Sequence, residues 1–182
     1  KNQEFKPTVL ISLGGNTNFD FLSKILISLS SIKISLKIIL TLPQKDSDYI
    51  KIKKWNNLSQ HDFHILVANK NIASLMAESH LAIASFGVTA YELLAVGTPS
   101  ILYSLTEDHM ESASLFSEAG VSICLGKIAN FDCSKLEKTL TNLFNNPSKL
   151  EKMSQPYISS QIRNSTKNVV SRITRDIKKF DD

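Results

Sequence analysis

Residues 80–99 read HLAIASFGVTAYELLAVGTP, and this stretch decides the fold expected for the whole chain. The apolar run 80–84 predicts a buried strand, and residues 85–87 predict a sharp turn. A helix is expected over 88–96, because Gly97 is a typical helix stop and Pro99 follows it. A strand, turn and helix in this order direct the first N–H groups of the helix, and its positive dipole end, toward one point. Such a point suits a phosphate group.

Glu92 lies about one turn into this expected helix. A carboxylate at that position can accept two hydrogen bonds from a diol such as a ribose. The alternative is an ordinary strand–helix unit of an α/β protein, in which these residues serve the fold alone.

The composition is that of a globular protein. The chain has 182 residues, of which 42% are hydrophobic and 21% are charged, and this balance is not typical of a disordered chain. The net charge of +4 comes from lysines spread along the sequence. We interpret them as solvated helix faces and expect no nucleic-acid partner. We also expect neither a stable membrane span nor a signal peptide.

The cysteines and three of the histidines lack the spacing of metal ligands. Cys124 and Cys133 stand apart from each other, and we interpret them as reduced thiols in a cytoplasmic protein. His61, His64 and His80 are interpreted as core or strand-flanking residues. We therefore expect no metal and no cofactor.

The first residue is Lys1 rather than Met, and Pro7 leads directly into a predicted strand. We expect the chain to be a domain of a longer protein. Residues 1–156 are expected to form one Rossmann-like domain and residues 157–182 a long C-terminal amphipathic helix. The apolar positions of that helix recur at steps of three, four and seven: Ile158, Ile162, Val169, Ile173, Ile177 and Phe180.

Strands and helices alternate along the chain. Strands are predicted at 8–13, 36–42, 63–67, 81–84, 100–103 and 121–125. Helices are predicted at 19–31, 48–57, 71–78, 88–96, 109–119, 132–144 and 148–153. This alternation predicts an α/β fold with a doubly wound, six-stranded parallel sheet in the order 3-2-1-4-5-6.

In this order the first and fourth strands are neighbours, and the strand order reverses between them. Ligands of such sheets bind outside the carboxyl ends of the strands at that reversal. The loop after the first strand contains Gly14, Gly15 and Asn16, and the loop after the fourth is the 85–87 turn. Two glycines permit close approach of a ligand to the backbone, although a plain tight turn would also use them.

Two further loops are expected at the same edge. Val67, Ala68 and Asn69 follow the third strand, and their backbone could pair with the edge of a flat base. Glu107, Asp108 and His109 follow the fifth strand, where they could hold sugar hydroxyls. The alternative for the two acids is that they stabilise the helix dipole.

Together these residues resemble the C-terminal, nucleotide-sugar-binding half of GT-B fold enzymes. The closest similarity is to the UDP-sugar hydrolase of pseudaminic acid biosynthesis and to relatives in spore-coat polysaccharide synthesis. The motifs that carry the resemblance are SLGGN at 12–16, NIASLMAES at 71–79, ASFGVTAYEL at 84–93 and GTP at 97–99, followed by Glu107-Asp108-His109 with Ala113 and Gly120 downstream.

The resemblance implies a role for each loop. The diphosphate would be held by Gly14, Gly15, Asn16, Ser85, Phe86, Gly87, Val88 and Thr89. Glu92 would bind the ribose, and the backbone of Val67, Ala68 and Asn69 would bind the uracil. Glu107, Asp108 and His109 would contact the sugar, although family members usually carry Asn-Gln or Gln where this chain has Asp108-His109. The family's catalytic histidine is expected in an N-terminal domain, so no catalytic residue is assigned here.

The resemblance therefore predicts the UDP-sugar-binding half of an enzyme of surface-polysaccharide or nonulosonic acid biosynthesis. The full-length protein would hydrolyse a UDP-linked amino-deoxy sugar. One alternative is a glycosyltransferase that passes the sugar to a lipid or polysaccharide, and another is a non-enzymatic α/β interaction module. We expect the terminal helix to reach the absent N-terminal domain, and the chain to be a monomer or weak dimer that is inactive alone.

Overall fold

The computed structural model describes residues 6–15, 18–43, 47–53 and 58–154. The strands are β1 (Thr8–Ser12), β2 (Lys37–Leu42), β3 (Asp62–Val67), β4 (Leu81–Ser85), β5 (Ser100–Ser104) and β6 (Ser122–Lys127). The helices are α1 (Phe19–Ser30), α2 (Ser47–Lys53), α3 (Ile72–Glu78), α4 (Val88–Val96), α5 (Glu107–Glu118), α6 (Cys133–Asn145) and α7 (Pro147–Met153), with a short 3₁₀ turn, η1 (Ile128–Asn130). The predicted helix over 157–182 lies outside the described residues.

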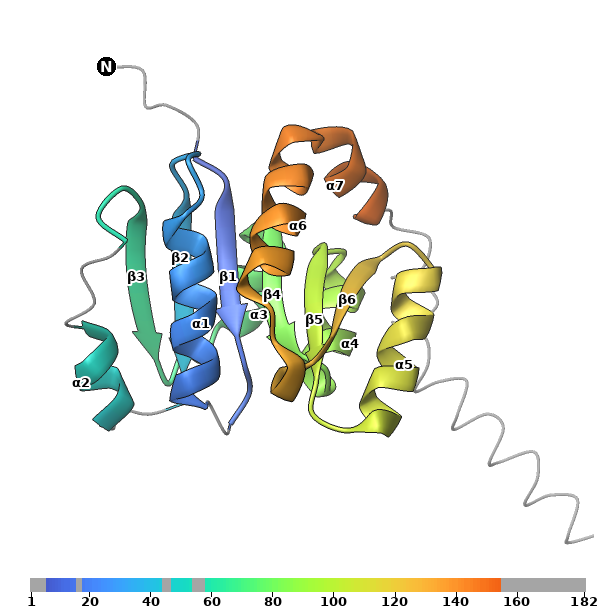
Figure 1. The fold of residues 1–182 in the computed structure, drawn as a ribbon, viewed down its shortest axis with the longest axis horizontal. Helices are drawn as coiled ribbons and strands as arrows, with labels where there is room; N and C mark the ends of the chain where they lie inside the picture. The colour runs from blue at the N-terminus through green and yellow to red at the C-terminus, as the bar shows by residue number, and fades with distance from the viewer. Residues whose placement is uncertain (1–5, 16–17, 44–46, 54–57, 155–182) are drawn as a thin grey trace, which may run out of the picture.

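All six strands are parallel and belong to one sheet in the order β3-β2-β1-β4-β5-β6 (Figure 1). The predicted doubly wound order is confirmed. β1 lies between β2 and β4, with Ile11 opposite Leu40 on one side and Ile83 on the other. These three side chains are fully buried, as expected for a parallel sheet that is covered on both faces.

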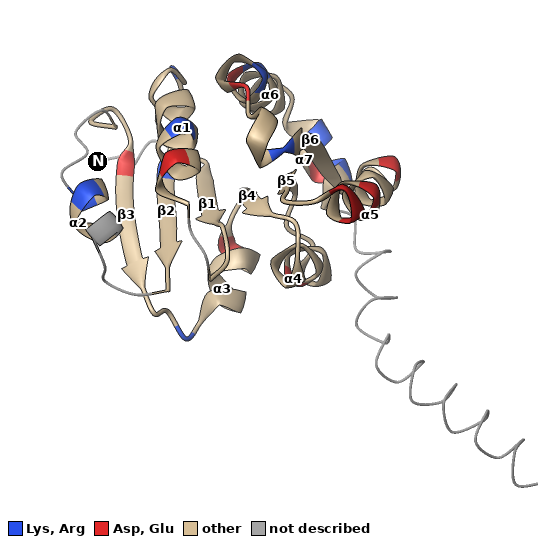
Figure 2. Cartoon of the chain, turned by 60° about the horizontal axis from the view of Figure 1, so that its bottom comes forward, with Lys and Arg blue, Asp and Glu red and all other residues tan. Residues whose placement is uncertain are grey.

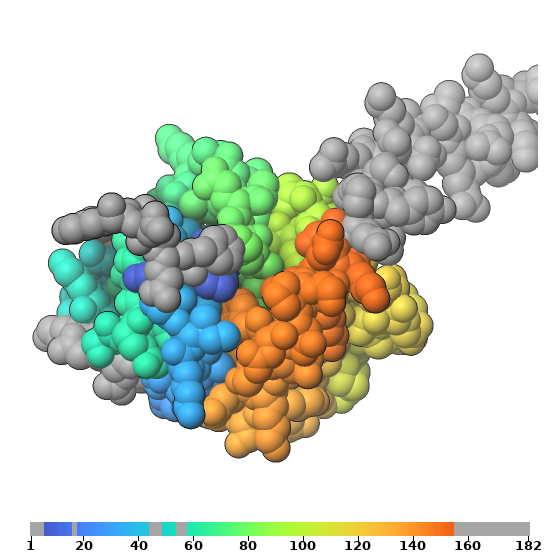
Figure 3. Space-filling view, turned by 90° about the horizontal axis from the view of Figure 1, so that it is seen from above, coloured from blue at the N-terminus to red at the C-terminus, as the bar shows by residue number. Residues whose placement is uncertain are grey.

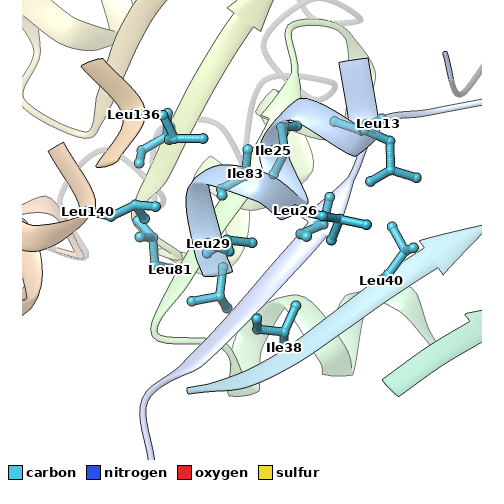
Figure 4. Close-up of a cluster of buried hydrophobic side chains, with 14 of the residues drawn as sticks. Leu13, Ile25, Leu26, Leu29, Ile38, Leu40, Leu81, Ile83, Leu136 and Leu140 are labelled. Carbon is cyan, nitrogen blue, oxygen red and sulfur yellow. The ribbon is translucent and has the colours of Figure 1, made fainter. Parts of the chain in front are cut away.

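Helices cover both faces of the sheet. The apolar faces of α1 and α6 pack on one face, where the core includes Leu29, Leu136 and Ile83 (Figure 4). α3, α4 and α5 cover the other face through Met76, Leu93 and Ala113 and their neighbours. The result is a three-layer α/β/α domain. In the ranges given above, no helix combines the length and apolar character that a bilayer crossing needs.

One helix boundary differs from its prediction in a way that affects the site. The fifth helix was expected from residue 109, but α5 begins at Glu107. Thr106 precedes it in an extended conformation, and its hydroxyl oxygen accepts a hydrogen bond from the His109 N–H at 3.2 Å. Glu107 and Asp108 therefore lie in the first helical turn, where carboxylates stabilise the helix dipole.

A groove of about 790 Å³ lies at the amino edge of the sheet, the edge that faces the reader in Figure 3. Pro7, Val96 and Phe144 line it, together with other residues near the ends of α3, α4 and α6 and along α7, among them the acidic Glu151. Helix C-termini carry the negative end of the dipole and disfavour an anion. The groove therefore does not suit a phosphate, and parallel α/β sheets bind their ligands at the opposite edge.

His61 is a buried polar link at this amino edge. Its Nε2 lies 2.8 Å from the Leu29 carbonyl oxygen at the end of α1, and its Nδ1 accepts a hydrogen bond from the Leu36 N–H at 3.3 Å. With Nδ1 as acceptor the ring is neutral, and Nε2–H donates to Leu29. Burial lowers the pKa of His61 below its usual value of about 6.5.

The chain is expected to lose stability as the pH falls below about 6.5. In the window between the lowered pKa of folded His61 and that value, the unfolded chain binds a proton that the folded chain does not. Urea unfolding at pH 7.5 and 5.5 measures the loss. His61→Gln should reduce it, whereas His64→Gln should retain it, because His64 is exposed and its pair with Asp62 lies at the surface. An equal loss in both variants would contradict the role of His61.

Candidate functional site

Four connections at the carboxyl edge of the sheet enclose a cleft of about 270 Å³. Figure 2 turns this edge toward the reader. The cleft is lined by residues after β1, at the end of β2, after β3 and in α4: Ser12, Gly14, Gly15, Thr41, Leu42, Pro43, Ala68, Asn69, Ile72, Thr89 and Glu92. It lies where β1 and β4 are neighbours and the strand order reverses, which is the position that the topology predicts.

The cleft brings together residues from three of the four predicted loops. Gly14 and Gly15, Ala68 and Asn69, and the α4 residues Thr89 and Glu92 all border it. Gly14 and Glu92 are 78 positions apart in sequence yet lie on the same cleft. Asn16 lies outside the described residues.

The start of α4 differs from the other helix starts at this edge in its capping and charge. The other long helices that begin at this edge, α1, α5 and α6, are capped by the side chains of Asn18, Thr106 and Asp132. α4 follows Gly87, which has no side chain, and its first turn contains no acidic residue. The first N–H groups of a helix have no partner within the helix, and the dipole adds positive potential there. Among these four helices, α4 is therefore the best placed to receive a phosphate.

Gly14 and Gly15 form the opposite wall. Gly14 has a φ of +80°, which an L side chain rarely adopts, so the backbone itself selects glycine at that position. A Cβ at either glycine would meet no atom within 4 Å. The space above both residues is therefore open, and a ligand can approach their backbone closely.

Thr89 and Glu92 are three residues apart on α4 and line the same cleft. Residues at this spacing are neighbours on one helix face. The exposed carboxylate of Glu92 can accept two hydrogen bonds there, while the Thr89 hydroxyl lies nearer the helix start. This order, polar hydroxyl before carboxylate, suits a ligand whose phosphate precedes a diol.

The loop after β3 has an unusual backbone. Ala68 has a φ of +50° and is the only non-glycine residue with positive φ in the described part of the chain. Its N–H donates to the Leu42 carbonyl oxygen at 2.9 Å. The next residue, Asn69, accepts a hydrogen bond from the Asn71 N–H at its Oδ1 atom, at 2.7 Å. Local strain of this kind is often found at ligand sites.

Other predicted site residues lie beside the cleft but do not line it. Val67, Ser85, Gly87 and Val88 are in this group, although Gly87 and Val88 flank the open end of α4. Phe86 has a different role from the expected one. Its ring is 5% exposed and packs against His109, Tyr91 and Phe116, and its N–H donates to the Tyr103 carbonyl oxygen at 2.7 Å. Neither its ring nor its N–H is available to a diphosphate.

The three residues expected to contact a sugar lie at the start of α5, outside the cleft lining. Glu107 forms an ion pair with the ammonium of Lys127. His109 packs beside Phe86 with ring centroids 5.8 Å apart, so it borders the β4–α4 turn. Asp108 is exposed in the first turn of the helix.

Sequence reasoning missed the wall formed by the end of β2. Thr41, Leu42 and Pro43 line the cleft, and the Thr41 hydroxyl donates to the Ile11 carbonyl oxygen at 3.2 Å. Ile72, at the start of α3, also lines it. The expected strand order already places the end of β2 beside that of β1, so the topology was the signal that could have identified these residues.

The described residues hold no group of three or more His, Cys, Asp or Glu side chains that could bind a metal ion. None of the cleft-lining residues is Lys or Arg, and Figure 2 shows α4 without a basic residue. An anion in this cleft would therefore be held by backbone N–H groups, hydroxyls and the helix dipole.

Ala68→Val is expected to lower the free energy of unfolding by about 1–2 kcal/mol, because a β-branched side chain disfavours positive φ. Ala68→Gly should raise it by up to about 1 kcal/mol, because relief of the strain at positive φ outweighs the larger backbone entropy that glycine loses on folding. Urea denaturation of both variants measures the difference. A valine variant as stable as the parent would show that this loop is not constrained.

Comparison with known proteins gives the family. The model for the glycosyltransferase family 28 C-terminal domain matches residues 8–171. No curated protein matches the chain in sequence.

Solved structures share the fold at low identity. MurG of Acinetobacter baumannii superposes with a TM-score of 0.70 at 18% identity, over 89% of this chain and 52% of that protein. UDP-GlcNAc 2-epimerase of Neisseria meningitidis, bound to UDP-GlcNAc, superposes with a TM-score of 0.69 at 19% identity, over 93% of this chain and 45% of that protein. The spinosyn rhamnosyltransferase SpnG, in complex with spinosyn aglycone, superposes with a TM-score of 0.69 at 16% identity, over 87% of this chain and 42% of that protein.

The chain spans about half the length of these structures. Its six-stranded parallel sheet is the Rossmann-like fold of a GT-B C-terminal domain. The family model covers most of the sequence, including every strand and the whole cleft. The chain belongs to the glycosyltransferase family 28 C-terminal domain family.

Proposed function

We propose that this chain is the donor-binding half of a glycosyltransferase and that it binds a UDP-sugar in the cleft at the carboxyl edge. The observation that carries the proposal is the meeting of Gly14, Gly15, Thr89 and Glu92 around one cleft beside the open start of α4. Membership of the family supports the same assignment.

The cleft offers a place for each part of a nucleotide. The diphosphate would lie between Gly14, Gly15 and the first turn of α4, where N–H groups and the helix dipole favour negative charge. Glu92 would accept hydrogen bonds from the ribose hydroxyls. A uracil would lie toward Ala68 and Asn69, beside the apolar side chains of Pro43 and Ile72, which also border the cleft.

Transfer is favoured over the expected hydrolysis. The family model and two of the superposed structures, MurG and SpnG, fit a transferase better than a hydrolase. The chain spans about half of those structures, so the acceptor and the catalytic base would lie in a second domain. We place the sugar contact at His109 and Asp108, which lie beside the β4–α4 turn.

This half of the site would act on the leaving group. As the bond between the sugar and the diphosphate breaks, negative charge grows on the diphosphate. The fixed N–H groups at the start of α4 are oriented before the reaction, so they stabilise that charge without reorganisation. A second domain would exclude water and align an acceptor hydroxyl with the anomeric carbon, and this exclusion separates transfer from hydrolysis.

The chain alone is expected to bind UDP weakly and to release no sugar from UDP-GlcNAc, because it supplies leaving-group stabilisation without a base or an acceptor. Isothermal titration calorimetry measures the binding, and chromatography of the nucleotide products measures turnover. Steady release of UDP by the isolated chain would contradict the proposal that the catalytic base and the acceptor lie in a second domain. Heat changes equal to buffer dilution would contradict UDP binding.

Glu92→Gln is expected to weaken UDP binding about tenfold, because a charged acceptor of ribose hydroxyls becomes a neutral one. The loss should be smaller for 2′-deoxy-UDP, which lacks one of those hydroxyls. Glu118→Gln is the matched control, since Glu118 is exposed at the far end of α5. Equal losses for UDP and 2′-deoxy-UDP would show that Glu92 does not bind the ribose.

A further inference from the structure

The connection between β5 and α5 contains two buried polar atoms without a hydrogen-bond partner among the described residues. They are the hydroxyl oxygen of Ser104, the last residue of β5, and Nδ1 of His109, in the first turn of α5. Ser104 is fully buried. Buried polar atoms are normally hydrogen-bonded, so each requires an explanation.

Both atoms lie on the same side of the sheet. Side chains along a strand alternate between the two faces. In β5, Ile101 and Tyr103 pack in the core on the α1 and α6 side, whereas Leu102 packs with Phe86 on the other. Ser104 therefore lies on the Leu102 side. The His109 ring packs against Phe86 on that same side.

The start of α5 fixes the backbone of His109, which follows Ser104 by five positions in the sequence. Thr106, two residues after Ser104, accepts the His109 N–H at 3.2 Å. A buried water molecule needs at least two polar partners, and these two atoms supply a pair within one short connection. We propose that one buried water molecule joins Ser104 Oγ to His109 Nδ1, which makes Ser104 the positioning residue for the His109 ring.

The other ring nitrogen of His109, Nε2, can form a hydrogen bond with a ligand. Nε2 of His109 makes no hydrogen bond within the part of the chain that the structure describes, and it is not among the buried unpartnered atoms. It is therefore not fully buried, and it belongs to a half-buried side chain at the start of α5, at the carboxyl edge. With Nδ1 held by the water, Nε2 keeps one direction relative to the β4–α4 turn. This consequence rests on the proposed function, which places the donor sugar beside that turn. Loss of the Ser104 hydroxyl should then weaken binding of the sugar, through the His109 ring, and leave binding of the nucleotide unchanged.

High-resolution crystal structures of the chain and of its Ser104→Ala variant test the water link without reference to any ligand. We expect one ordered water within hydrogen-bonding distance of both atoms in the parent and its loss in the variant. Electron density with no shared water, or with a direct hydrogen bond between Ser104 and His109, would overturn the proposal. This result stands even if UDP does not bind.

Binding measurements test the positioning role. The ratio of UDP-GlcNAc affinity to UDP affinity should fall about fivefold in Ser104→Ala, as expected for the loss of one well-placed hydrogen bond. Ser104→Thr, which keeps the hydroxyl, should recover the ratio. Ser122→Ala is the matched control, because Ser122 is another buried serine whose hydroxyl has no partner among the described residues. Ser122 is the first residue of β6, so it lies at the amino edge, away from the cleft. Equal ratios in Ser104→Ala and Ser122→Ala would overturn the positioning role, whereas failure of both nucleotides to bind the parent would overturn the proposed function.

Discussion

The parallel pairing of β1 with β4 is the constraint on which the rest of the structure depends. Val9 pairs with Leu81 and Ser12 with Ala84, so the two strands end together at the carboxyl edge. Their connections then turn to opposite faces of the sheet, with α1 on one and α4 on the other. This divergence opens a cleft that no single loop could form. The buried apolar strands hold it rigidly, because shifting the register would expose their core side chains.

The second feature of the site is an unusual distribution of helix caps. Side chains cap the first turns of α1, α5 and α6, and an acidic side chain lies at each of these three helix starts. α4 has neither a side-chain cap nor an acid in its first turn, so the positive end of its dipole is not offset by its own side chains. The proposed diphosphate site would therefore need no basic side chain in the cleft lining. Binding of this kind depends on backbone geometry, and it is less sensitive to side-chain substitution than an arginine site would be.

Aromatic packing connects the cleft to the region proposed for the sugar. Phe86 lies between the β4–α4 turn and the start of α5, in contact with Tyr91, His109 and Phe116. This cluster fixes the distance between the open helix start and the His109 ring. The ion pair of Glu107 with Lys127 joins the start of α5 to the end of β6. A rigid separation between the diphosphate and sugar positions is what donor recognition would require.

The sequence by itself determined the strand and helix alternation, the sheet order and three of the loops that meet at the cleft. Apolar runs and helix stops such as Gly97 are local signals, and the handedness of parallel crossovers leaves few ways to arrange six strands. Only the tertiary structure decided that Phe86 is a buried packing residue and that Glu107 pairs with Lys127. These properties depend on contacts between residues far apart in the chain, for which neighbouring sequence carries no signal.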